Sequence, residues 1–140
     1  MICNAAKSPA QKRYLRRVLL FTGLYLVTFA LQTALTKEND LSVFTRTAFA
    51  LLPGFCISGV FWAIGRLIVE EQDEFQRMLT VRQAMIASGL AMASASVWGF
   101  LEGAAVVPHV DAYWWAVVWF IGLAIGGAVN RVQYGSWGMA

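Results

Sequence analysis

Four long uncharged stretches alternate with short charged segments along the chain. They run over residues 18–35, 47–65, 83–101 and 112–129, and each is 18 or 19 residues long. At roughly 1.5 Å of rise per residue, such a stretch forms about 27 to 29 Å of helix, close to the roughly 30 Å hydrocarbon thickness of a bilayer. The pattern therefore predicts four transmembrane helices.

The apolar stretches favour helices over strands. Lipid cannot satisfy open backbone groups, and the stretches lack the two-residue alternation of a barrel wall. The composition, 59% hydrophobic and 14% charged, also exceeds what a soluble domain of this length tolerates. Because the connections are short, neighbouring spans should run antiparallel. We expect an all-α integral membrane protein whose residues 1–140 form one up-and-down four-helix bundle.

Basic residues predict the orientation of the spans. Nine of them fall on one side: Lys7, Lys12, Arg13, Arg16, Arg17, Arg66, Arg77, Arg82 and Arg131. Only Lys37 and Arg46 fall on the other, so the positive-inside rule places both termini in the cytoplasm. The net charge of +3 is then an orientation signal, and no basic groove with interleaved aromatics indicates a nucleic-acid partner.

Half of the eight acidic residues lie within five positions between the second and third spans. The candidate interaction residues here are Glu70, Asp73, Glu74 and Arg77, together with Glu71. Spacings of four predict the pairs Arg66 to Glu70 and Asp73 to Arg77. Each exposed pair contributes only about 0.3 to 0.5 kcal/mol, so stability does not explain the density of charge. A solvated loop and a cytoplasmic docking surface for a basic partner both fit.

Small side chains predict where helices pack closely. On a helical wheel one face of the third span is small throughout, with Ala84, Ser88, Ala91, Ala95 and Gly99. The fourth span carries Gly122-x-x-x-Gly126. These faces fit packing within the bundle or between chains. Residues 135–140 are expected to form a frayed tail.

Glu102 lies five helical turns after Ala84 and so projects along the same face of the third span. A carboxylate at that depth is costly unless it is wet or paired. Arg46, at the outer start of the second span, is the available partner. An Arg46 to Glu102 pair is one hypothesis, and separate snorkelling of both side chains into the outer headgroups is the other.

The sequence lacks the common catalytic motifs. There is no Ser/His/Asp set, no Cys/His pair, no P-loop and no Gly-x-Gly-x-x-Gly. The acidic cluster lacks the histidines of a helical di-metal site. Trp98, Tyr113, Trp114 and Trp115 are typical of an interfacial aromatic belt. We expect no enzyme activity, no metal and no cofactor.

Two segments carry a family resemblance. They are Asp73-Glu74-Phe75-Gln76-Arg77 and Trp98-Gly99-Phe100-Leu101-Glu102-Gly103. The basic end of the fourth span, Asn130-Arg131-Val132-Gln133-Tyr134, is similar too. They resemble a family of small four-span bacterial inner-membrane proteins with a D-E-x-x-R motif and a G-x-L-E helix end. The resemblance covers about residues 70–134. It implies a multi-pass protein of the bacterial inner (cytoplasmic) membrane and brings no activity with it.

Two classes of function fit these features. The first is a structural or accessory subunit that binds a larger membrane protein complex, or a second copy of itself, through its small-residue faces and acidic cluster. The second is a small dimeric transporter or channel in which Glu102 or the inner carboxylates handle cations or protons. A coupling carboxylate is usually found near the middle of a span, and no charge lies there. We therefore favour the first class.

Overall fold

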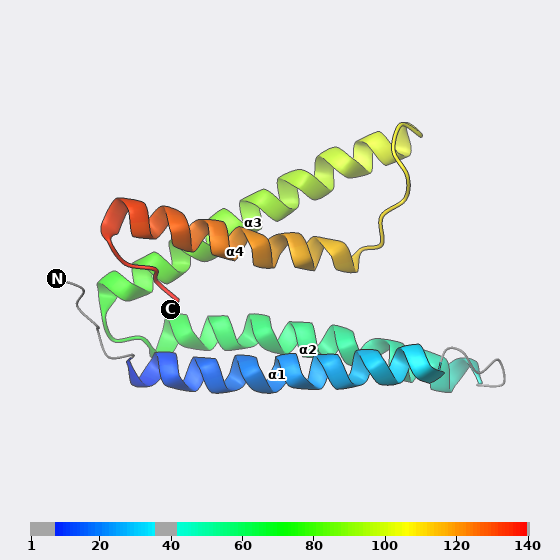
Figure 1. Cartoon of the computed structure of the whole chain (residues 1–140), viewed down its shortest axis with the longest axis horizontal. Coiled ribbons are helices and arrows are strands. Elements are labelled where there is room, and N and C mark those ends of the chain that lie inside the picture. Colours follow the sequence, from blue (N-terminus) through cyan, green and yellow to red (C-terminus); the bar gives the residue numbers. More distant parts are fainter. Residues whose placement is uncertain (1–7, 36–41, 140) are drawn as a thin grey trace. The chain divides into compact units, whose positions relative to one another are not determined.

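All the secondary structure that the computed structural model describes, in residues 8–35 and 42–139, is helical. The four helices are α1 (Pro9–Leu35), α2 (Val43–Glu70), α3 (Glu74–Gly103) and α4 (Tyr113–Tyr134) (Figure 1). Each is long and apolar enough to cross a membrane. The prediction of an all-helical chain with four such helices is confirmed for these residues. Lys7 and Lys37, which entered the charge count, lie outside them.

Polar caps let the helices extend past the apolar stretches. Ser8 and Gln11 bond reciprocally at the start of α1, since each backbone N–H donates to the other's side chain. The Asp73 carboxylate accepts the backbone N–H groups of Phe75 and Gln76 and so caps α3. The acidic cluster is thus divided, because Glu70 ends α2 and Glu74 begins α3.

The chain divides into two compact units, one ending at Glu71 and the other beginning at Gln72. In the first unit α1 packs against α2, and in the second α3 packs against α4 (Figure 1). We call these two pairs of consecutive, packed helices the first and the second hairpin. The single four-helix bundle expected from the sequence remains a prediction.

The first hairpin is held by a stripe along α2. Its buried residues recur every three or four positions, with Ala63 and Ile64 adjacent to each other, and are Pro53, Cys56, Val60, Ala63, Ile64 and Leu67. Facing them, Phe21 of α1 lies directly over Gly59, so closely that a Cβ at this position would collide with its ring. Further along the hairpin, the Thr28 hydroxyl lies 3.9 Å from the sulfur of Cys56.

The second hairpin brings two backbones into close contact. A Cβ added at Gly122 would lie 2.7 Å from the Cα of Ala87, and one added at Gly126 would lie 2.9 Å from the carbonyl oxygen of Gln83. Such spacing is possible only without side chains at these two positions. The buried residues of α3 are Leu79, Thr80, Gln83, Ala87 and Ala91.

The segment after α4 returns to α3. Gly135 ends the helix in the left-handed region, at φ 71°, where its N–H bonds the Arg131 carbonyl at 2.9 Å. The chain then places Gly138 in a buried position, and the Met139 N–H donates to Oε1 of Gln83 at 3.2 Å. The expectation of a frayed tail is therefore wrong for residues 135–139, because Gln83 anchors them. Ala140 lies outside the described residues.

Candidate functional site

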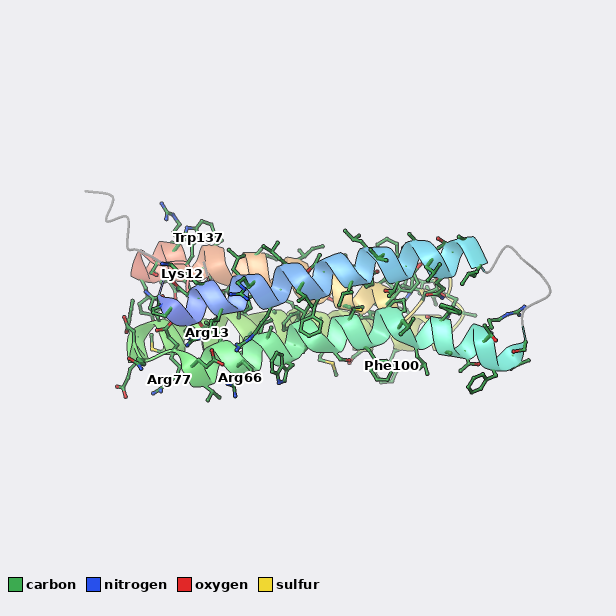
Figure 2. The ribbon with its side chains drawn as sticks, turned by 90° about the horizontal axis from the view of Figure 1, so that it is seen from below. Lys12, Arg13, Arg66, Arg77, Phe100 and Trp137 are labelled. Atoms are coloured by element: carbon green, nitrogen blue, oxygen red, sulfur yellow. The ribbon has the colours of Figure 1, made fainter. Side chains whose placement is uncertain are left out.

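Three arginines converge on Glu70 at one end of the first hairpin. Two of them, Arg13 and Arg66, are labelled in Figure 2. Arg13 Nε donates to Oε2 at 2.9 Å. Oε1 accepts from Arg17 Nη2 at 3.0 Å and from Arg66, whose Nε and Nη2 lie 2.8 and 2.7 Å away. We call these four residues the Glu70 cluster. The i,i+4 pair of Arg66 and Glu70 expected from the sequence is confirmed, and Arg13 and Arg17 join it from α1.

The cluster is partly shielded from solvent. The Glu70 side chain is 12% exposed, whereas those of Arg13 and Arg66 are 52% and 47% exposed. The Arg17 guanidinium stacks over the Trp62 ring at 5.2 Å from its centroid, a cation–π arrangement. Charge-assisted bonds of this kind are shorter and stronger than neutral ones. They hold the ends of α1 and α2 together where the apolar stripe stops.

Glu70 occupies an unfavourable position for an acid on its own helix. It is the last residue of α2, where the helix dipole presents partial negative charge. Three positive neighbours outweigh that effect, since two of them lie across the hairpin at hydrogen-bond distance. The position of Glu70 is thus set by tertiary pairing and not by helix preference.

Replacing Glu70 by glutamine is expected to lower the unfolding midpoint of the protein in neutral detergent. The three guanidiniums would then repel one another around a neutral amide. Circular dichroism during heating measures the midpoint. Glu74→Gln is the matched control, because Glu74 is 88% exposed and lies 3.5 Å from a single arginine, Arg77, among the described residues. Equal midpoints for the two variants would contradict a structural role for the cluster.

The other acids of the segment have separate partners. Glu71 is buried and accepts the Ser8 hydroxyl at 2.7 Å. Asp73 caps α3, and Arg77 lies 3.5 Å from the carboxylate of Glu74, three residues before it, while the Asp73 to Arg77 pair stays a prediction. The Glu74 side chain is 88% exposed.

The predicted small-residue face of α3 is only partly the face that contacts α4. Ala91 is buried there, and Ser88 accepts the indole N–H of Trp119 at 3.0 Å. Ala84 and Ala95 are half-buried, and Gly99 is exposed, with no atom within 4 Å of an added Cβ. The close contact between α3 and α4 is instead centred on Ala87, beside this face of α3.

Two buried amides in the second hairpin were missed at the sequence level. Gln83 Nε2 donates to the Leu123 carbonyl at 2.8 Å, and Asn130 Nδ2 donates to the Leu79 carbonyl at 2.9 Å. Asn130 is completely buried. Both lie at the ends of apolar stretches, where an amide looks like an ordinary interfacial residue. Only the position of the opposite backbone shows that they bridge two helices.

At the other end of this hairpin Glu102 contacts His109. The carboxylate lies 2.5 Å from Nδ1, and Asp111 Oδ1 lies 3.8 Å from Nε2. The hydrogen bond and charge of Glu102, supported by Asp111, raise the pKa of His109 above its ordinary value. Arg46 belongs to the first hairpin and lies in the first turn of α2, so its pairing with Glu102 stays a prediction.

The His109 contact is expected to weaken at high pH. A raised folded-state pKa means that the contact stabilises the folded protein fully below the unfolded pKa of about 6.5 and is lost as pH rises through the higher folded value. The chain has a single histidine, so its NMR titration is unambiguous. We expect a pKa above 6.5 that falls in Glu102→Gln and is unchanged in Glu74→Gln. An ordinary pKa in the parent protein would contradict the contact.

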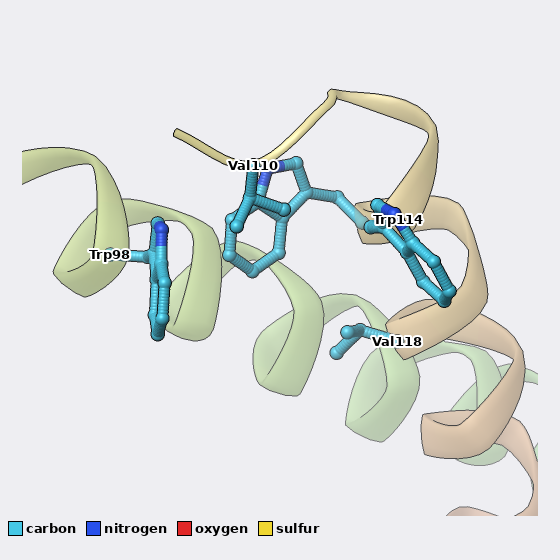
Figure 3. A pocket seen from close by; sticks show the side chains of 5 residues that line it. Trp98, Val110, Trp114 and Val118 are labelled. Carbon is cyan, nitrogen blue, oxygen red and sulfur yellow. The ribbon is translucent and has the colours of Figure 1, made fainter. Parts of the chain in front are cut away.

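Three indoles line a shallow pocket beside this contact. Trp98, Trp114 and Trp115, with Val110 and Val118, enclose about 350 Å³ (Figure 3). The Trp98 N–H donates to the Pro108 carbonyl at 3.2 Å, which fixes the loop against α3. Three of the four residues expected in an aromatic belt thus line one pocket, and Tyr113 does not. An apolar lining suits an apolar group and offers no acid or base for catalysis.

Within the described part of the chain, no group of three or more His, Cys, Asp or Glu residues could hold a metal ion. The charged and amide side chains described above form ion pairs or hydrogen bonds with one another and with backbone groups. Comparison of the chain with protein-family models, with curated proteins and with solved structures finds no match. Function must therefore be inferred from the geometry of the two hairpins.

Proposed function

We propose that the protein is a structural or accessory subunit of a membrane protein complex, without enzyme activity. It binds other membrane proteins through its helix surfaces. One observation carries the proposal. The hairpins leave small residues of their helices uncovered, since a Cβ added at Gly23, Gly54, Gly89 or Gly99 would meet no atom within 4 Å. In lipid, such positions are where helices approach one another closely.

The proposed arrangement is an antiparallel four-helix bundle in a bacterial inner membrane, with both termini in the cytoplasm. Two contacts support the antiparallel pairing of α1 with α2. Arg17 near the start of α1 bonds Glu70 at the end of α2, and the later Thr28 lies beside the earlier Cys56. The basic residues near Arg13 and Arg66 support the cytoplasmic side through the positive-inside rule.

Glu74 and Asp73 supply the polar part of the proposed docking surface. Glu74 is 88% exposed, and Asp73 is exposed while its carboxylate caps α3. A basic partner segment would find both charges beside the first turn of one helix. A variant that removes the Asp73 charge must keep the N-cap of α3. Asparagine caps a helix about as well as aspartate does.

Purification of the tagged protein from its native membrane in mild detergent tests the proposal. Mass spectrometry is expected to find the same larger membrane protein in independent preparations. Asp73→Asn with Glu74→Gln should reduce its recovery several-fold while the cap of α3 is kept. Asp111→Asn is the matched control at another exposed acid and should leave recovery unchanged. Recovery of the protein alone from every preparation would overturn the proposal.

A further inference from the structure

The charges around the Glu70 cluster do not balance. At this end of the first hairpin the described residues include five basic and two acidic side chains: Lys12, Arg13, Arg16, Arg17, Arg66, Glu70 and Glu71. Figure 2 shows Lys12, Arg13 and Arg66 toward the same end of the hairpin. Lys12 and Arg16 are exposed, and about half of the Arg13 and Arg66 side-chain surface is open to solvent. This end of the hairpin therefore carries an excess of three positive charges, and four of its five basic side chains are open to solvent at its surface.

Glu70 fixes this surface without neutralising it. Its two oxygens accept from three guanidiniums, each of which has five N–H donors in a planar fork. Nη1 of Arg17 is buried and has no acceptor among the described residues. Guanidinium forks match the geometry of phosphate oxygens. The carboxylate thus pre-orders the arginines and leaves exposed donors of Arg13 and Arg66, and excess charge, for a second anion.

The location of the cluster indicates which anion is available. Arg17 directly precedes the apolar stretch that begins at Val18, and Arg66 directly follows the stretch that ends at Gly65. Trp62, under Arg17, is the kind of side chain that lies at headgroup depth. Anionic lipids of the cytoplasmic leaflet attract basic segments at this depth.

We propose that the Glu70 cluster is a binding site for the phosphate of an anionic phospholipid in the cytoplasmic leaflet. Arg13 and Arg66 contact the phosphate, and Glu70 holds their forks in place through its oxygens. The proposal rests on the membrane placement given above but not on the accessory role. It identifies a lipid partner for a cluster that would otherwise appear only to join two helices.

Reconstitution into vesicles of phosphatidylcholine alone, or with about a quarter phosphatidylglycerol, tests the site. Native mass spectrometry of protein released from the mixed vesicles is expected to show retained phosphatidylglycerol. Arg13→Gln with Arg66→Gln should lower this retention on the order of tenfold. Arg17 still pairs with Glu70 in this variant, so the two helices remain joined. The matched control is Arg77→Gln with Arg131→Gln, which removes the same charge from the second hairpin and should retain the lipid.

Four outcomes separate the possibilities. Equal loss in both double variants would overturn the site in favour of net charge, and displacement of the lipid by millimolar inorganic phosphate would overturn the choice of a lipid. If Arg13→Gln with Arg66→Gln does not fold, the parent protein must still melt higher with phosphatidylglycerol than without it, by a margin that shrinks in salt. Extraction of the parent protein by alkaline carbonate would refute the membrane placement itself, separately from any headgroup preference.

Discussion

Gly122→Ala is expected to destabilise the second hairpin by about 1 to 3 kcal/mol, the cost of forcing an extra methyl group into packed structure. The new Cβ would lie 2.7 Å from the Cα of Ala87 and 3.2 Å from its carbonyl oxygen. Both colliding atoms belong to the Ala87 backbone, so α3 and α4 must move apart. Alanine gains up to about 1 kcal/mol of helix propensity over glycine, which offsets only part of this cost.

Reversible unfolding in mixed detergent micelles, followed by circular dichroism, measures the Gly122 effect. Gly99→Ala is the matched control, because an added Cβ there meets nothing within 4 Å and the residue is exposed. It should be neutral or slightly stabilising, through helix propensity alone. Similar losses of stability in the two variants would show that α3 and α4 do not pack on Gly122.

The helices could be predicted because their physical cause is local. An uncharged stretch such as 83–101 has only one way to satisfy its backbone in lipid, so its sequence determines its secondary structure. The caps extend the helices further than hydropathy indicates. Asp73 reads equally well as a loop acid or as an N-cap, and only the bonds to Phe75 and Gln76 decide between them.

The packing face of α3 was predicted less well, because the helix has small residues on several sides. Ala84, Ala87 and Ala91 all permit close approach, and hydropathy does not rank them. The choice depends on Gly122 and Gly126, whose bare backbones meet Ala87 and Gln83. A pattern within one helix cannot determine its rotation against another helix.

The Glu70 cluster shows the same limit for charged residues. The pair with Arg66 follows from a spacing of four on one helix, and it was predicted. Arg13 and Arg17 are 57 and 53 residues away from Glu70 along the chain. In the sequence they belong to the basic segment from which the orientation of the spans was predicted. Their second role, as partners of Glu70, depends on how α1 and α2 align.

Asn130→Ala is expected to destabilise the second hairpin by about 1 to 3 kcal/mol. The side chain is fully buried, and the change removes its bond to the Leu79 carbonyl and leaves a small void. No donor among the described residues bonds Asn130 Oδ1, so removal of this buried oxygen offsets part of the loss. The bond and the void outweigh that single carbonyl.

Gln133→Ala is the matched control for Asn130, one turn later on α4. Its amide bonds Arg82 at an exposed position, where substitutions usually change stability by no more than about 0.5 kcal/mol. Unfolding in mixed micelles compares the two variants, and Asn130→Leu separates the two contributions because it refills the volume without restoring the bond. A loss in Asn130→Leu as large as in the alanine variant would assign the effect to the hydrogen bond, and full recovery would assign it to packing. Stability unchanged in both would mean that the amide does not join α4 to α3.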